Sequence, residues 1–278
     1  MSIPAAPRGA RGTIRPLVRA AHAGPAFAVV VLTLLLGVAA DLDAGRLVLV
    51  GLAVLTGQLS VGWSNDLIDE ARDRAVGRTD KPLVAGEVTR ATVRLACTVA
   101  VVTTVVLSLA CGLWAGVVHL FCVASAWAYN ARLKSTVWSW APYAASFGGL
   151  VVFVSLAGRP PELPPSWVPL AAALLGVGAH LLNVMPDLAQ DEATGVRGLP
   201  HRLGPRLLPA VATSVLVLAS AVVVVGTGMT RGSVAVLVLV GILAGATVVG
   251  RGRVPFLAAI GIALADVVLL VTADKLPG

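Results

Sequence analysis

The sequence predicts an all-α polytopic membrane protein, a bundle of about nine transmembrane helices. Mean hydropathy is +0.90 over 278 residues, of which 57% are hydrophobic and only 13% are charged. Apolar runs of about twenty residues, the length that crosses a bilayer core as a helix, recur along the chain. No long polar stretch separates them, so we expect residues 1–278 to form a single integral membrane domain, with residues 1–16 as a basic cytoplasmic tail.

Nine spans follow one another along the chain. They lie at about residues 17–40, 46–64, 91–111, 113–129, 139–157, 167–186, 207–227, 232–250 and 254–273. The first span has no early apolar core followed by a small-residue cleavage site, so we expect it to be retained rather than removed as a signal peptide. The chain contains 29 glycines and 17 prolines, residues that membrane helices tolerate because small side chains permit close packing and neighbouring helices support kinks.

The middle spans carry few reactive side chains. The third and fourth contain Cys97, Cys111 and Cys122 without a CxxC spacing, and we interpret these cysteines as small buried residues. The fifth begins beside Trp138 and Trp140, which are typical of the aromatic belt at a membrane interface.

The sixth and ninth spans carry polar residues inside the apolar region. His180, Asn183 and Asp187 share one face of the sixth span, which Pro186 ends or kinks. His180 is expected either to be packed and hydrogen-bonded or to contact an acceptor molecule. Asp266 lies near the middle of the ninth span, where a carboxylate is costly. Pairing within the bundle and a functional role both stay open for it.

The basic residues indicate the orientation in the membrane. If the loops between nine spans alternate between the two sides of the membrane, all but four of the 21 lysines and arginines lie on one side of it. This asymmetry predicts that the N-terminus and the loops after even-numbered spans are cytoplasmic. A net charge of +7 and a pI of 10.2 would suit a nucleic-acid-binding soluble protein. Here the topology accounts for the excess, and no nucleic-acid partner is expected.

Charge is concentrated after the second and sixth spans in two related segments. The first reads NDLIDEARDRAVGRTDKP at residues 65–82, and the second reads PDLAQDEATGVRGLPHRLG at residues 186–204. Each contains two aspartates four residues apart and a glycine four residues after the second. The matching residues are Asp69, Asp73 and Gly77 in the first segment and Asp187, Asp191 and Gly195 in the second. Because four spans separate the segments, both face the same compartment.

The aspartates are spaced for a shared helix face. Asp66, Asp69 and Asp73 stand at positions i, i+3 and i+7, and Asp187 and Asp191 stand one turn apart. Carboxylates aligned in this way repel one another unless cations lie among them. All-oxygen ligands favour Mg²⁺, whose coordination is completed by water and substrate phosphates. We therefore predict an Mg²⁺ site. The alternative is a hydrated loop on which the acids pair with neighbouring arginines.

Basic side chains on the same side would bind phosphate. They are Arg72, Arg78, Lys81, Lys134 and Arg197. Guanidinium forks suit phosphate oxygens, whereas lysine acts as a point charge. Acids with a divalent metal, ringed by such bases at an apolar cavity, describe a receptor for a diphosphate with an apolar tail. Each base taken singly is as consistent with a topology marker as with a ligand.

At these residues the sequence resembles the UbiA superfamily of intramembrane prenyltransferases, over essentially the whole chain. The first family motif, NDxxDxxxD, is matched by Asn65, Asp66, Asp69 and Asp73. The second, DxxxD, is matched by Asp187 and Asp191, which Asn183 precedes. A Tyr–Lys element is matched by Tyr129 and Lys134 in YNARLK. Two positions depart from the family pattern. Lys81 and Pro82 stand where Arg-Pro is common, and Gly198 stands where a threonine precedes Leu-Pro.

The resemblance implies a site and a mechanism. Two Mg²⁺ ions held by Asn65 and the five aspartates would grip the diphosphate, and the five bases would take its remaining oxygens. Ionisation would leave an allylic cation that an acceptor captures. Residues 74–87 would form a lid that excludes water. Tyr129, His180 and Asn183 are candidates for the acceptor or cation pocket.

Three other functions stay open. A UbiA-type terpene cyclase would ionise the same diphosphate without an acceptor, and another relative would transfer a polyprenyl phosphate onto a phosphoribosyl diphosphate. A membrane transporter is more distant, because transporters bind substrate at the midplane of inverted repeats, whereas these acids lie at one face in a parallel repeat. The expected partners are an isoprenyl diphosphate, a hydrophobic aromatic or lipidic acceptor and membrane lipid. The sequence determines neither the acceptor, the prenyl length nor the oligomeric state.

Overall fold

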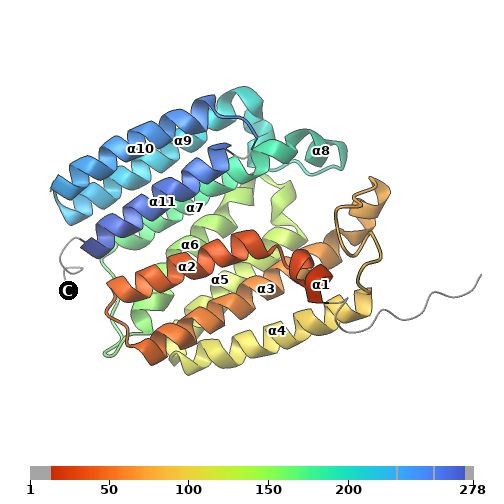
Figure 1. The fold of residues 1–278 in the computed structure, drawn as a ribbon, viewed down its shortest axis with the longest axis horizontal. Helices are drawn as coiled ribbons and strands as arrows, with labels where there is room; N and C mark the ends of the chain where they lie inside the picture. The colour runs from red at the N-terminus through yellow and green to blue at the C-terminus, as the bar shows by residue number, and fades with distance from the viewer. Residues whose placement is uncertain (1–13, 230, 253, 273–278) are drawn as a thin grey trace, which may run out of the picture.

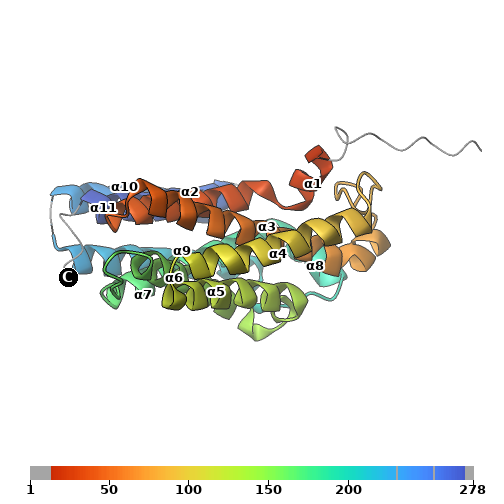
Figure 2. The same cartoon turned by 90° about the horizontal axis from the view of Figure 1, so that it is seen from below.

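The computed structural model describes residues 14–229, 231–252 and 254–272, which form helices and turns and contain no strand. The prediction of an all-α protein is therefore confirmed for this part of the chain. Most of the predicted basic tail, with Arg8 and Arg11, lies outside the described residues, as do Arg253 and Lys275. The long helices run side by side, with their connections at the two ends of the bundle (Figures 1 and 2).

Eleven α-helices and three short 3₁₀ helices make up the described chain. The α-helices are α1 (Ile14–Ala20), α2 (Ala23–Ala39), α3 (Ala44–Ala75), α4 (Arg90–Ala110), α5 (Leu113–Ala131), α6 (Ala141–Leu156), α7 (Trp167–Val184), α8 (Leu188–Ala193), α9 (Leu199–Thr227), α10 (Arg231–Val249) and α11 (Val254–Thr272). The 3₁₀ helices are η2 (Leu133–Ser135), η3 (Val137–Trp140) and η4 (Met185–Asp187).

The count of membrane-spanning helices agrees broadly with the nine predicted spans. Seven described helices are long and apolar enough to cross a membrane, and the bent pair α1–α2 makes an eighth. The ninth predicted span corresponds to α11, whose apolar part, Val254–Leu269, is shorter than the others. The protein is therefore an integral membrane protein by composition and length of its helices.

The first predicted span is broken rather than continuous. α1 and α2 meet at an angle of 71°, and His22 at the junction has a left-handed backbone with φ of 53°. The break packs against α3, where a Cβ added to Gly62 would lie 2.2 Å from the carbonyl oxygen of Ala21. The indole of Trp63 also donates to the carbonyl oxygen of Leu17 at 2.9 Å. These contacts hold α1 and the break against α3.

The second predicted span is longer than expected. α3 contains 32 residues, about 48 Å of helix at 1.5 Å per residue, which exceeds a bilayer core by several turns. The first aspartate motif was predicted to follow this span, which was expected to end near residue 64. The structure places it instead on the last turns of α3, because the helix continues to Ala75.

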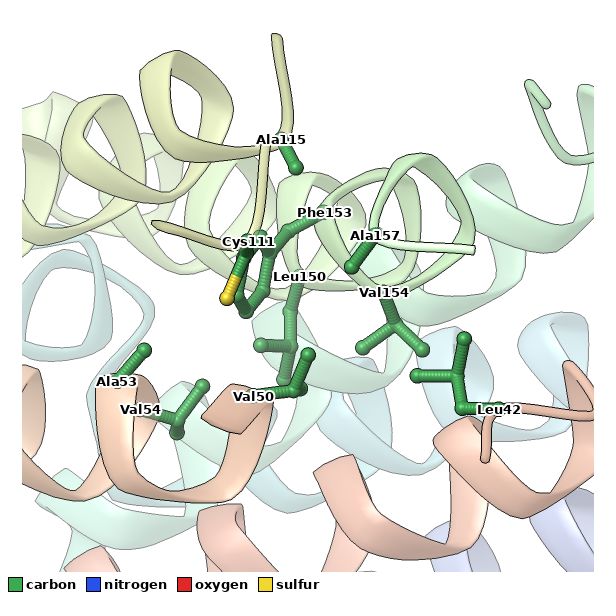
Figure 3. Close-up of a cluster of buried hydrophobic side chains, with 10 residues drawn as sticks. All are labelled: Leu42, Val50, Ala53, Val54, Cys111, Ala115, Leu150, Phe153, Val154 and Ala157. Atoms are coloured by element: carbon green, nitrogen blue, oxygen red, sulfur yellow. The ribbon is translucent and has the colours of Figure 1, made fainter. Parts of the chain in front are cut away.

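One large buried apolar cluster lies at the end of the bundle opposite the aspartates. Figure 3 shows its ten side chains, which come from α3, α5, α6 and the turns that follow α2, α4 and α6: Leu42, Val50, Ala53, Val54, Cys111, Ala115, Leu150, Phe153, Val154 and Ala157. Apolar packing therefore supports the end of the bundle opposite the aspartates, and a separate apolar cluster around Trp63, Leu83 and Val88 packs at the acid-rich end.

Candidate active site

The two aspartate motifs end their helices in the same way. Gly77 and Gly195, which match in the sequence repeat, have φ of +70° and +81°. The amide after each glycine donates to the carbonyl oxygen of the second aspartate, Asp73 or Asp191, at 2.9 Å in both cases. Each glycine amide bonds to the next carbonyl, at 3.3 and 3.1 Å. This pattern is the Schellman motif, so the repeat encodes two helix ends with an aspartate at the same position.

The first motif presents one buried acidic face. Asp66, Asp69 and Asp73 are only 2%, 6% and 4% exposed, which confirms that their spacing turns them to the same side of α3. Asp73 lies in the last turn of α3, where the partial negative charge of the helix end disfavours a carboxylate. These acids therefore do not serve to stabilise the helix, and their burial requires cations nearby.

Asp66 is held by two side chains from different segments. Lys81 Nζ donates to Asp66 Oδ1 at 2.7 Å, and His22 Nε2 lies 3.0 Å from the same oxygen. Lys81 and His22 are themselves 2.9 Å apart. Asp66 Oδ2 is buried and has no hydrogen-bond partner in the described structure. One oxygen of this carboxylate is therefore open to a further ligand.

Asp69 is at the centre of a second set of contacts. Lys134, on η2, donates to both of its oxygens, at 2.6 Å for Oδ2, and Arg72 pairs with Oδ2 at 2.8 Å. The Asn65 amide donates to Oδ2 at 3.1 Å. Burial lowers the pKa of Lys134, and the hydrogen bond and charge of Asp69 oppose this effect. The Tyr–Lys segment and the first motif therefore meet at Asp69.

The loop after α3 covers the first motif and is tied to α1. Leu83 and Val88 are buried with Trp63 in one apolar cluster. Arg19 donates to Glu87 at 2.8 Å and to the carbonyl oxygen of Asp80 at 2.9 Å. In Figure 2, α1 and this loop lie together at one end of the bundle. The residues predicted as a lid thus lie over the acids, with Lys81 pointing down to Asp66.

The second motif approaches the first from α7 and α8. Asp187 ends η4 and is exposed, and Asp191 on α8 is partly buried. Arg78, from the loop after α3, donates to Gln190 at 3.4 Å, so side chains of the two motif segments touch. Arg78 also forms a fork with Asp80 and lowers the pKa of that carboxyl. Figure 1 shows α8 and the loop after α3 at the same end of the bundle.

Arg197 is the predicted phosphate ligand that the structure does not bring to the aspartates. Its side chain is 69% exposed and pairs with Glu192 at 3.6 Å. The other four predicted bases, Arg72, Arg78, Lys81 and Lys134, each contact a residue of a motif segment.

Four aromatic rings from α5, α6 and α7 form an aromatic cluster: Tyr129, Tyr143, Phe147 and His180. Tyr143 stacks on His180 with ring centroids 4.4 Å apart and meets Tyr129 edge-on at 5.2 Å. His180 is fully buried and bonded to Ser139 Oγ at 3.1 Å, the packed state that was one of its two expected roles. Asn183, expected to share its face, is exposed instead.

The donor set fits Mg²⁺ in its chemistry. The motifs supply carboxylate oxygens, which suit a hard divalent cation, and one of them, Asp66 Oδ2, is buried without a partner. Within the described ranges, no three acidic, histidine or cysteine side chains converge closely enough to hold a metal as they stand. Lys81, Lys134 and Arg72 neutralise the carboxylates in this arrangement. The metal ligands named from the sequence stay a prediction.

Sequence reasoning left His22 and His201 without a role, yet each lies beside a motif aspartate. His22 contacts Asp66, and His201 Nε2 lies 3.7 Å from Asp191 Oδ2. His201 directly follows the second motif, so its position was an available signal. His22 is 44 residues from Asp66, and no spacing could have indicated their contact.

Asp266 lies on α11 and belongs to neither motif. It is 2% exposed, and Oδ2 accepts a hydrogen bond from Ser220 on α9 at 2.9 Å. Of the two interpretations left open by the sequence, the structure therefore shows pairing within the bundle.

Comparison with known proteins identifies the family of this chain. The sequence model of the UbiA prenyltransferase family matches residues 25–265. The bacteriochlorophyll synthase 33 kDa chain of Cereibacter sphaeroides is 35% identical over 193 residues, which are 64% of this chain and 62% of that protein. This chain therefore matches about three fifths of the length of that relative.

Solved structures share the fold at low sequence identity. A UbiA homologue from Aeropyrum pernix K1 superposes with a TM-score of 0.72 at 16% identity, covering 88% of this chain and 96% of that one. A UbiA homologue from Archaeoglobus fulgidus bound to GPP and Mg²⁺ gives a TM-score of 0.69 at 16% identity, covering 93% and 98%.

Proposed function

This chain belongs to the UbiA prenyltransferase family, and from that premise we propose that it transfers a prenyl group from an isoprenyl diphosphate to a hydrophobic acceptor within the membrane. The observation that carries the proposal is the meeting of two aspartate motifs, on α3 and on η4–α8, at one end of the bundle. Diphosphate is the second product. The acceptor is aromatic or lipidic.

The proposed metal ligands are Asn65 and the five motif aspartates. When bound, Mg²⁺ would neutralise negative charge on the diphosphate leaving group. Support comes from the buried face of α3 and the unpartnered oxygen of Asp66. The similar protein from Archaeoglobus fulgidus is described as bound to GPP and Mg²⁺, which also supports a pair of substrate and metal of this kind.

Lys81, Lys134 and Arg72 are proposed to bind the diphosphate oxygens. In the structure each of them is paired with Asp66 or Asp69. A cation that takes over these carboxylates would release the three basic side chains toward the substrate. Arg78, which contacts Gln190 of the second motif segment, is proposed to bind the same oxygens. We do not include Arg197 in this group, because its contact is with exposed Glu192.

The proposed chemical step is an ionisation followed by capture. The allylic carbon–oxygen bond breaks, and its electron pair leaves with the diphosphate. The nucleophilic atom of the acceptor then bonds to the allylic carbon and loses a proton. The aromatic cluster of Tyr129, Tyr143, Phe147 and His180 has ring faces that suit a positive charge on the prenyl group. The loop over the motif would exclude water during the reaction.

The active-site end is proposed to be cytoplasmic, in the cell membrane. Basic residues gather at the end that carries the motifs, in keeping with the positive-inside distribution. The terpene cyclase is the nearest alternative, since it would use the same acids and bases without an acceptor.

Diphosphate release from the purified protein tests the proposal. Allylic diphosphates of several lengths would be offered with and without Mg²⁺, and with and without a lipid extract or a bacteriochlorophyll precursor as acceptor. The precursor is included because of the similarity to a bacteriochlorophyll synthase chain. We expect release that requires Mg²⁺, an acceptor, Asp69 and Asp187, as tested with Asp69→Asn and Asp187→Asn. Release without an acceptor would support the cyclase. No release from folded protein would reject the proposal and favour a transporter.

A further inference from the structure

We propose that His201 is a positioning residue of this site, which donates a hydrogen bond from Nε2 to Asp191 and so holds the second motif ready for the metal. The inference rests on the proposed function, because Asp191 matters only if the motif binds a cation. It adds a residue that belongs to neither aspartate motif and lies on a different helix, α9.

The protonated nitrogen of His201 follows from a backbone contact. The amide of Gly198 donates to His201 Nδ1 at 3.1 Å. A backbone amide can only donate, so Nδ1 must be unprotonated and accept this bond. In a neutral imidazole the proton is then on Nε2. His201 therefore presents a donor on the side of the ring that faces Asp191.

That donor is buried and lacks a partner. The His201 side chain is 5% exposed, and Nε2 makes no hydrogen bond within the described structure. The nearest acid is Asp191, whose Oδ2 lies 3.7 Å away, and Asp191 is 28% exposed at the side chain. Buried donors without acceptors are rare because they lose their hydration. A shift of less than 1 Å by the Asp191 side chain would bring Oδ2 within hydrogen-bond distance.

The ring is anchored to the segment that carries Lys134. A Cβ added to Gly198 would lie 2.6 Å from the carbonyl oxygen of Lys134, so this position excludes the threonine that the family pattern favours. The amide of Leu199 donates to Ser139 Oγ at 3.0 Å. These contacts fix the start of α9 against η2 and η3. His201 thus fixes the position of Asp191 relative to Lys134, which binds Asp69.

Two substitutions separate positioning from packing. His201→Gln keeps an oxygen that accepts from Gly198 and an amide that donates to Asp191. His201→Leu keeps the apolar bulk and removes both hydrogen bonds. The full chain in detergent would be titrated with Mn²⁺ in the presence of inorganic diphosphate, and free Mn²⁺ would be followed by electron paramagnetic resonance. Mn²⁺ is a suitable probe because it uses the same oxygen ligands as Mg²⁺.

We expect His201→Leu to weaken Mn²⁺ binding about ten-fold, the lower range for loss of an outer partner of a metal ligand, and His201→Gln to stay near the wild type. The Mg²⁺ concentration for half-maximal diphosphate release should rise in parallel, with most of the maximal rate recovered at saturating Mg²⁺. His119→Leu is the matched control. It removes another buried histidine, bonded to Ser108 at 2.7 Å, and should leave Mn²⁺ binding unchanged.

Three results would overturn the inference: unchanged Mn²⁺ binding in His201→Leu, equal losses in the Leu and Gln variants, or absence of Mn²⁺ binding by the wild type. Thermal unfolding in detergent identifies a variant that has failed to fold. If His201→Leu fails to fold, Mn²⁺ binding by the folded His201→Gln variant decides between positioning and packing. Failure of the proposed function is distinguishable, because a wild type that binds Mn²⁺ but releases no diphosphate would contradict the transfer reaction and leave the role of His201 standing.

Discussion

Lys134 and Arg197 show how differently two bases predicted for the same task are placed. Lys134 is mostly buried, with 11% of its side chain exposed, and bonds to both oxygens of Asp69. Arg197 is mostly exposed and pairs at 3.6 Å with Glu192, which is itself exposed. Exposed pairs of this kind contribute little. We therefore expect their substitutions to differ in effect although both remove one positive charge.

Lys134→Met should raise the KM for the prenyl diphosphate by about ten-fold or more, because a charge-assisted hydrogen bond contributes about 1.5–3 kcal/mol. Lys134→Arg, which keeps the charge, should lose less. Arg197→Met should change KM by less than about two-fold. Steady-state diphosphate release at saturating Mg²⁺ measures all three. Equal losses in Lys134→Met and Arg197→Met would contradict the placement of the two bases.

At the scale of elements, the repeated glycines connect the sequence pattern to the shape of the site. Gly77 and Gly195 both adopt positive φ at the end of an aspartate-bearing helix. A residue with a Cβ costs about 1–2 kcal/mol in this left-handed conformation. The glycines thus serve to stop the helices at a set distance from Asp73 and Asp191, and their role is conformational rather than chemical.

Gly77→Ala and Gly195→Ala should each lower the free energy of unfolding by about 1 kcal/mol, whereas asparagine at the same positions should cost less. Gly241→Ala, on α10 with open space around an added Cβ, is the control and should be neutral or slightly stabilising. Thermal unfolding in detergent would measure the series. A stable alanine variant at either motif glycine would argue against the helix-end interpretation.

The broken α1–α2 pair is a second element that shapes the site. Gly62 lets the break approach α3 closely, since an added Cβ would lie 2.2 Å from the Ala21 carbonyl oxygen. Backbone atoms cannot yield as a flexible side chain can. His22, one residue beyond Ala21, contacts Asp66, so the packing of the break also places a side chain at the first motif.

Gly62→Ala should therefore cost about 1–3 kcal/mol of stability, in the range of overpacked sites, and lower Mg²⁺-dependent diphosphate release by moving His22 away from Asp66. Gly245→Ala, where nothing lies within 4 Å of the added Cβ, is the matched control. Unfolding temperature and release would be measured together. Full activity and stability in Gly62→Ala would show that the contact with α1 is dispensable.

For the whole molecule, the topology predicted from charge can be tested on the intact membrane. The described structure brings Lys134 to Asp69 and Arg78 to Gln190, so the loops of both motifs lie at one end of the bundle. The positive-inside distribution predicts that this end is cytoplasmic. The native cysteines are all buried, which leaves a low background for labelling with thiol reagents.

Thr79→Cys and Ala193→Cys, at exposed positions near the motifs, should resist a membrane-impermeant maleimide in intact cells and react after permeabilisation. Glu162→Cys, exposed in the connection between α6 and α7, should react in intact cells. The fraction of protein modified is measured by mass shift. The opposite pattern would invert the orientation and place the active-site end outside the cytoplasm.

The sequence by itself determined the class of fold and the acids of the site. Apolar runs of about twenty residues cross a membrane as helices, because a helix satisfies all backbone polar groups within the segment. The spacing of Asp66, Asp69 and Asp73 placed them on one face because helix geometry is local. The repeat of aspartates and glycine was visible for the same reason. What the spacing could not show was that the first motif continues α3 instead of starting a loop, since charged residues are compatible with either.

Only the tertiary structure decided which side chains reach the acids. His22 and Lys134 come from segments distant in sequence from the motif residues they face, and His201 lies on a different helix from Asp191. Their approach depends on a helix break, a close contact at Gly198 and the packing of α9. Such contacts arise from the folding of separate elements against one another, so no local period in the sequence records them. Arg197 shows the opposite case. It lies close to Asp191 in the sequence, but the fold does not bring its side chain to the site.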